Sequence, residues 1–165
     1  MRVVMAAVLA VAVLVLGAVV GVMWADLRAL RGADADGVEA TAAARTALPE
    51  LMSYDYRTVD RDLARARSRT TGALSGYYGE LARSLAGKAR AQRTVQTASV
   101  TAAAVERAEP GRVEVLLFVN TGTVREVPGE AAPQRQISQN RVRLTMVRGD
   151  RGWLAADLST LIGTV

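Results

Sequence analysis

The chain has neither cysteine nor histidine among its 165 residues. Without cysteine there can be no disulfide framework, thiol nucleophile or thiolate metal site. Without histidine the chain lacks the commonest metal ligand and the commonest general base near neutral pH. Zinc enzymes built on these ligands and hydrolases of the Ser-His-Asp type are therefore excluded, and we expect no metal ion and no cofactor.

Aromatic residues make up only 4% of the chain, and Lys88 is the sole lysine among 21 basic residues. The basic excess lies between Arg57 and Arg93, a stretch without the interleaved aromatics of a single-strand nucleic-acid binder. We therefore expect no nucleic-acid partner. Arg57, Arg61 and Arg65 lie four residues apart, so they form a basic face that is either simply solvated or attracts anionic lipid or an acidic partner.

One long run, Val3 to Ala25, contains no charged side chain. As a helix it would be about 34 Å long at roughly 1.5 Å per residue, and the hydrocarbon core of a bilayer is about 30 Å thick. Trp24 at its end suits the membrane interface. A cleaved secretory signal is the alternative, but Met23 stands where cleavage requires a small residue. The run therefore predicts an uncleaved transmembrane anchor over residues 1–25.

Small residues share one face of this predicted helix, namely Ala6, Ala10, Gly17 and Gly21. Small residues allow membrane helices to approach closely. This face could therefore pack on another helix, in a partner or in a second copy, although alanine and glycine are also common in any such segment. The few basic residues near the two ends leave the orientation open.

Residues 26–37 are polar, contain two glycines and indicate a short connector, followed by an alanine-rich stalk helix up to residue 53. Pro49 should end or kink that helix. A separate domain is expected over residues 54–165. Apolar residues at helical spacing predict a helix pair over 57–71 and 73–88, with a break near Gly72 and with Leu74, Tyr77, Leu81 and Leu85 on the second inner face.

From residue 94 the apolar pattern changes to a period of two, which is typical of strands. The expected strands are 94–107, 112–119, 137–147 and 153–158. Pro110-Gly111 has type II turn chemistry, and residues 120–136, with two glycines and two prolines, indicate a long loop.

Helices followed by antiparallel strands predict an α+β fold in which a curved four-stranded sheet packs on the helices. The expected core residues are Trp153, Phe118, Leu116, Leu144 and Leu63. This is the cone of the cystatin-like, or nuclear-transport-factor-2-like, folds.

Several short motifs occur in a characteristic order: Leu51 to Asp60 (LMSYDYRTVD), Tyr77-Tyr78, Val115 to Asn120 (VLLFVN) and Gly152 to Leu158 (GWLAADL). In this order, after one apolar span, they resemble the Mce-associated membrane proteins of actinobacteria. The resemblance covers nearly the whole chain, and the closing Trp-x-x-x-Asp-Leu is its most recognisable part.

The resemblance implies a single-pass protein of the cell membrane whose domain lies on the extracytoplasmic side. It implies a non-catalytic accessory role, stabilising or assembling an Mce-type complex that imports lipids. It also implies a longer basic segment before the span than Met1-Arg2. An inner-membrane subunit of type IV secretion systems has the same plan and is the competing assignment.

The cluster Tyr54, Asp55 and Tyr56 could line a pocket at the mouth of the cone. There Asp55 would act as a base and a tyrosine as a donor, because an apolar site raises the pKa of a carboxyl group. The alternative is that the tyrosines pack and Asp55 caps the following helix. Trp153 and Asp157 could contact a partner, or be a core residue and an outward strand residue. A lipid-pocket or isomerase-like protein therefore remains an alternative to the accessory role.

Overall fold

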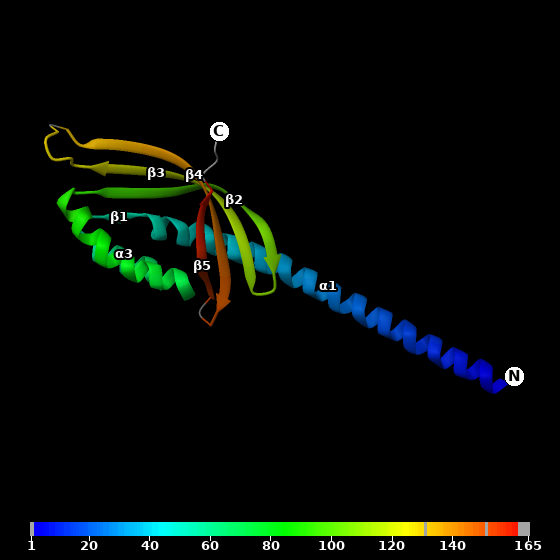
Figure 1. Cartoon of the computed structure of the whole chain (residues 1–165). Coiled ribbons are helices and arrows are strands. Elements are labelled where there is room, and N and C mark those ends of the chain that lie inside the picture. The colour runs from blue at the N-terminus through cyan, green and yellow to red at the C-terminus, as the bar shows by residue number, and fades with distance from the viewer. Residues whose placement is uncertain (1, 131, 151, 162–165) are drawn as a thin grey trace.

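A 51-residue helix begins the structure and leads into an antiparallel sheet (Figure 1). The computed structural model describes residues 2–130, 132–150 and 152–161, and in the first helix it describes most side chains only from Gly32 onward. The elements in chain order are α1 (Arg2–Met52), β1 (Tyr54–Asp55), α2 (Val59–Ser68), α3 (Gly72–Ala91), β2 (Val95–Glu109), β3 (Arg112–Arg125), β4 (Gln134–Gly149) and β5 (Gly152–Leu161).

The α1 helix runs through residues 26–37 without a break, so the expected connector is helical and continuous with the predicted stalk. Gly37 lies where α1 meets the sheet, and a β-carbon at this position would come within 3.4 Å of Val105 Cγ2. Glycine therefore permits a close approach of helix and strand. This packing offsets the cost of glycine in a helix, which is about 1 kcal/mol relative to alanine. The helix also passes Pro49 and ends at Met52.

All five strands lie in one sheet in the order β1-β2-β3-β4-β5, and each neighbouring pair is antiparallel. The predicted α+β fold is confirmed, but the sheet has one strand more than predicted. The additional strand, β1, pairs only Tyr54 with Gln96 and Asp55 with Val95, which is too short for a periodic pattern. Two irregularities in the register of β2 accompany the curvature of the sheet around α1 (Figure 1).

The prediction of a loop over residues 120–136 is wrong at both ends, because β3 continues to Arg125 and β4 begins at Gln134. Gly122 suggested a turn, yet it lies inside the ladder opposite Thr97 and Ile137. A β-carbon on Gly122 would lie 3.3 Å from Thr97 Oγ1, so this glycine permits close packing of side chains. The turn at Gly111, which has a φ of +74°, agrees with the predicted turn chemistry.

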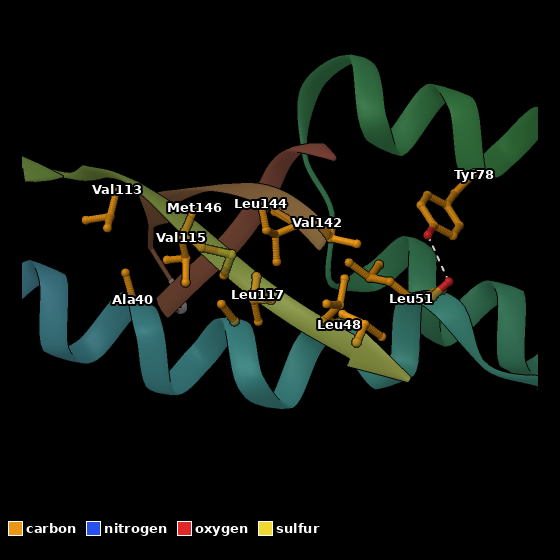
Figure 2. Packing of buried hydrophobic residues seen from close by; sticks show 14 residues of the cluster. Ala40, Leu48, Leu51, Tyr78, Val113, Val115, Leu117, Val142, Leu144 and Met146 are labelled. Carbon is orange, nitrogen blue, oxygen red and sulfur yellow. Dashed lines mark hydrogen bonds between the residues drawn. The ribbon is translucent and has the colours of Figure 1, made fainter. Parts of the chain in front are cut away.

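The core lies between the concave face of the sheet and the last four turns of α1 (Figure 2). Alternate residues of two central strands supply one side, because successive side chains of a strand point to opposite faces. These residues are Val113, Val115, Leu117 and Val119 on β3 and Val142, Leu144 and Met146 on β4. From α1 come Ala40, Ala44, Leu48 and Leu51. The predicted stalk thus contributes directly to the core along most of its length.

Of the five predicted core residues, some are buried and others lie on the outer face of the sheet. Leu144 and Leu63 are buried, as predicted, and Trp153 is partly buried against the main core. Leu116 is only half-buried and Phe118 is 43% exposed, so their assignment to the centre of the core is wrong. Both lie an even number of residues from the charged Arg112 and Glu114. They therefore point to the same face of β3, which is the outer one.

Within α3 the prediction placed the wrong tyrosine on the inner face. Tyr78 is buried, and its hydroxyl donates a 2.8 Å hydrogen bond to the carbonyl of Leu51 near the end of α1 (Figure 2). Tyr77 is 58% exposed. Burial raises the pKa of Tyr78, so its hydroxyl remains a donor. The predicted break near Gly72 is confirmed, because α2 ends at Ser68 and α3 begins at Gly72.

Among the residues that the structure describes, no helix is long and apolar enough to cross a membrane. Most side chains of the predicted span, including those of Ala6 and Ala10, lie outside the described residues. The anchor over residues 1–25 therefore stays a prediction.

Candidate functional site

The two groups of predicted site residues lie at opposite edges of the sheet. Tyr54 and Asp55 form the edge strand β1, whereas Trp153 and Asp157 lie on the other edge strand, β5. The structure therefore does not bring all of them into one pocket, and each group is described separately.

Asp55 has partners in the turn that connects β1 to α2. Its carboxylate accepts a 2.8 Å hydrogen bond from the backbone N–H of Arg57, and its carbonyl accepts one of 2.9 Å from Thr58. The Arg57 guanidinium lies 3.8 Å from the same carboxylate. Because α2 begins at Val59 with Thr58 as its N-cap residue, Asp55 fixes the turn before the helix and does not cap the helix itself.

The side chain of Asp62 completes this turn from α2. Its Oδ2 accepts hydrogen bonds from the Thr58 hydroxyl at 2.6 Å and from the backbone N–H of Asp55 at 3.2 Å. Arg57 also stacks on the Tyr56 ring, 5.0 Å from its centre, and donates to the Tyr56 hydroxyl. The contacts of Asp55 and Tyr56 thus serve to fix the entry to α2, while any part in partner or ligand binding remains a prediction.

A cavity of about 450 Å³ lies beside Tyr54, between the end of α3 and the far ends of β3 and β4. Asp55 is not among the residues that line it, and instead borders a separate surface pocket with Asp62 and Arg65. Tyr54 borders that second pocket as well, so Asp55 does lie beside a tyrosine there, and a role for Asp55 as a base stays a prediction.

Polar side chains line the sheet side of this cavity, namely Gln96, Thr121, Thr123, Gln136, Ser138 and Asn140. Several of them are held in place by hydrogen bonds. Asn140 Nδ2 donates to Thr121 Oγ1 at 3.3 Å, and Gln96 Nε2 donates to the Met52 carbonyl at 2.6 Å. Sequence reasoning missed this site because half of these residues lie in the predicted loop over 120–136.

At the opposite edge, Trp153 belongs to a charged cluster that fastens α1 to the sheet. Arg148 on β4 stacks over the Trp153 ring and forms ion pairs with Asp36 and Glu39 of α1. Asp36 also accepts a 2.7 Å hydrogen bond from the backbone N–H of Gly111 in the turn between β2 and β3. This N–H, and then the Arg148 guanidinium, lower the pKa of Asp36.

Asp157 is exposed on the edge strand, as an outward residue would be. Near the middle of this strand, Ala155 exchanges backbone hydrogen bonds of 2.9 Å with Arg69 and Thr71. The segment between α2 and α3 therefore covers the centre of the β5 edge and limits how much of that edge another strand could pair with.

The remaining predicted surface residues are exposed. Arg57, Arg61 and Arg65 all face solvent, which is compatible with either a solvated face or an anionic partner. Gly17 and Gly21 are exposed on α1, and an added β-carbon at either would meet nothing within 4 Å. Helix packing through these glycines therefore stays a prediction about contacts outside the chain.

Comparisons with solved structures show a shared fold. An IcmL-like type IV secretion system protein from Legionella pneumophila has a TM-score of 0.55 and 16% identity, over 76% of this chain and 92% of that chain. The periplasmic domain of DotI has a TM-score of 0.56 and 16% identity, over 74% and 93%. An Ntf2-like protein involved in plasmid conjugation has a TM-score of 0.51 and 11% identity, over 78% and 50%. The fold is therefore NTF2-like.

No family model matches the chain. The Mycobacterium tuberculosis protein Rv1362c is 32% identical over 70% of this chain, which spans only about half (51%) of that relative. The outer membrane protein Rv1973 of the same species is 35% identical over 84% of this chain and 83% of its own length. None of the proteins just described bears an Mce name, so an association with Mce complexes remains a proposal. The chain belongs to the family of the mycobacterial outer membrane protein Rv1973.

Proposed function

We propose that the chain is a non-catalytic subunit of a cell-envelope complex, with residues 3–25 as its membrane anchor and the NTF2-like domain as its docking module. The observation that carries the proposal is the continuity of α1. The helix that begins with the apolar run also supplies Ala40, Leu48 and Leu51 to the core of the domain. A partner that moves the domain would therefore act directly on the membrane segment.

The comparisons support the envelope location. The family member Rv1973 is named an outer membrane protein, and the similar DotI domain is periplasmic. We accordingly place the domain on the extracytoplasmic side, as the resemblance to the Mce-associated proteins also implies. The exposed Arg57, Arg61 and Arg65 could then meet anionic headgroups or an acidic partner surface.

Two assemblies are candidates for the partner. The likeness in fold to type IV secretion proteins favours a secretion-type channel, in which the chain would be an inner-membrane structural subunit. The order of the sequence motifs, from LMSYDYRTVD to GWLAADL, favours an Mce-type lipid importer. The fold likeness extends over about three quarters of the chain and makes the first candidate the stronger one.

Orientation can be tested cleanly because the chain contains no cysteine. A single cysteine replaces the exposed Ser84 on α3, and a matched variant carries it at Arg2 before the apolar run. Intact cells are treated with a membrane-impermeant maleimide. We expect labelling of Ser84→Cys in intact cells and of Arg2→Cys only after lysis. The reverse pattern, or labelling of neither in a membrane fraction, would contradict the proposed topology.

The partner can be identified by cross-linking in the native host, followed by mild-detergent purification and mass spectrometry. Secretion-channel subunits would support the first assembly, and Mce subunits or their permease would support the second. A chain recovered without either set of subunits, although it is folded and membrane-bound, would argue against a role in assembly.

A further inference from the structure

The concave face of the sheet changes its chemistry halfway along the central strands. Inward-facing residues of β3 are aliphatic up to Val119 and then polar at Thr121 and Thr123. On β4 the inward positions are polar up to Asn140 and aliphatic from Val142. The two changes lie side by side, because Val119 pairs with Asn140 and Thr121 with Ser138. One half of the concave face is therefore core, and the other half lines the 450 Å³ cavity.

The polar half of the concave face is partly shielded from solvent. Thr94 and Thr121, which both line the cavity, are only 6% and 9% exposed. Tyr54, which is partly exposed, lines the cavity as well. Desolvation raises the pKa of Tyr54, so the hydroxyl stays protonated and is available as a donor. Thr121 is already paired, because its hydroxyl donates to the Ser138 carbonyl at 3.3 Å and accepts from Asn140 Nδ2 at 3.3 Å, so the Tyr54 hydroxyl is the group that a polar ligand could meet.

The charges around the cavity have one sign. Lys88 on α3 and Arg125 at the end of β3 line it, and no aspartate or glutamate is among its described lining residues. Arg125 is positioned by two hydrogen bonds to Gln134 Oε1, at 3.2 and 3.3 Å. Lys88 has no acidic partner in the described part of the chain. Both cations are therefore available to an anion.

Two further features narrow the kind of anion. Met52, Leu85 and Ala89 give the cavity an apolar wall, which suits a ligand with an apolar body. The helix end at the cavity is the C-terminus of α3, whose partial negative charge opposes any anion, and opposes a doubly charged phosphate more strongly than a singly charged carboxylate. A singly charged carboxylate on an apolar body therefore suits this cavity better than a phosphate.

We propose that this cavity binds small organic monocarboxylates, with the carboxylate at Lys88 and Arg125 and the apolar body against Met52, Leu85 and Ala89. A cavity of this size lies within the range of small-molecule sites, which is about 300–1,000 Å³. Such binding goes beyond a role in assembly and does not require a partner protein.

The test is calorimetric titration of the full-length protein in a nonionic detergent with 2-naphthoate, using protein-free micelles as the blank. The uncharged 2-naphthamide has the same apolar body and serves as the matched ligand. We expect 2-naphthoate to bind at least about tenfold more tightly than 2-naphthamide, and the double variant Lys88→Gln/Arg125→Gln to lose about tenfold in affinity for 2-naphthoate.

Arg83→Gln is the matched control, because Arg83 is exposed on α3 and pairs with Glu80 away from the cavity. Its affinity should stay within about twofold of the wild type. Equal binding of naphthoate and naphthamide, unchanged affinity in the double variant, or no binding of naphthoate up to about 5 mM would each overturn the proposal. All of the substituted residues are exposed, so loss of folding is not expected to obscure the result.

Discussion

Arg148 and Trp153 lie directly opposite each other on β4 and β5, and the guanidinium carbon is 4.8 Å from the centre of the ring. The same guanidinium forms ion pairs with Asp36 and Glu39 on α1. One side chain thus connects the final hairpin of the sheet to the helix that enters the domain. Stacking on the ring restricts the long arginine side chain, which reduces the entropy lost when it pairs with the helix.

The first prediction concerns the pH dependence of stability through Asp36. Its folded-state pKa is lowered, so the carboxylate stabilises the fold above the ordinary aspartate value of about 3.9. This contribution is lost as the pH falls through the lower folded-state value. The Asp36→Asn variant should therefore melt below the wild type at pH 7, and the difference should shrink steadily below about pH 4. Circular dichroism melts of the full chain in detergent measure it.

Asp34→Asn is the control for this experiment, because Asp34 is exposed two positions earlier on the same helix. Its melting temperature should follow that of the wild type across the whole pH range. A constant difference between Asp36→Asn and the wild type from pH 7 to about pH 2 would show that the carboxylate charge is not what fastens α1 to the sheet.

The second prediction concerns the buried hydroxyl of Tyr78. Removing it in Tyr78→Phe leaves the Leu51 carbonyl without its 2.8 Å partner, and we expect a loss of about 1–2 kcal/mol in the free energy of unfolding. Tyr77→Phe, at the exposed neighbouring position, should change stability by less than about 0.5 kcal/mol. Chemical denaturation gives the free energy of unfolding of both variants. Equal decreases in the two variants would mean that the hydrogen bond from Tyr78 to Leu51 does not cause the loss of stability.

The third prediction uses two adjacent leucines on opposite faces of β3. Leu117 is fully buried against α1, so Leu117→Ala should cost about 2–5 kcal/mol through lost burial and an unfilled cavity. Leu116, on the outer face, is half-buried, and Leu116→Ala should cost about 1 kcal/mol or less. Unfolding midpoints of the two variants in urea measure the difference. A larger loss at Leu116 would mean that the outer face is covered by another chain.

The fourth prediction concerns the proposed membrane helix. Gly17 and Gly21 have open space around them, so leucine at both positions should not disturb the chain itself. If this face packs on another helix, Gly17→Leu/Gly21→Leu should reduce the recovery of cross-linked partners severalfold. Val20→Leu, an exposed position between them in sequence, serves as the control. Unchanged recovery in the double variant would remove this face as a contact surface.

Most of the sheet could be predicted from the sequence, because β-branched residues alternate with polar ones over long runs. This alternation predicts one inward face for Val142, Leu144 and Met146, and all three are buried. Leu116 and Phe118 are large and apolar, but they share their face of β3 with the charged Arg112 and Glu114, which mark that face as outward.

The cavity could not be found from the sequence, because glycines and prolines at 122, 128, 129 and 133 dominate the local pattern and suggest a loop. In the folded chain only the residues around 126–133 connect the strands, and Gly122 is needed for packing against Thr97. The inward polar residues become visible as a group only when both strands are extended through this region and their register is known.

The uninterrupted course of α1 also has a geometric consequence for any assembly. If residues 3–25 cross the membrane, the length of the helix between residue 25 and Ala40 sets the distance between the apolar run and the domain core, which is about 20 Å at 1.5 Å per residue. The same segment sets the orientation of the domain, because each residue inserted there would rotate the domain by about 100° around the helix axis. The length of this segment therefore fixes both how far the cavity stands from the membrane and which direction it faces.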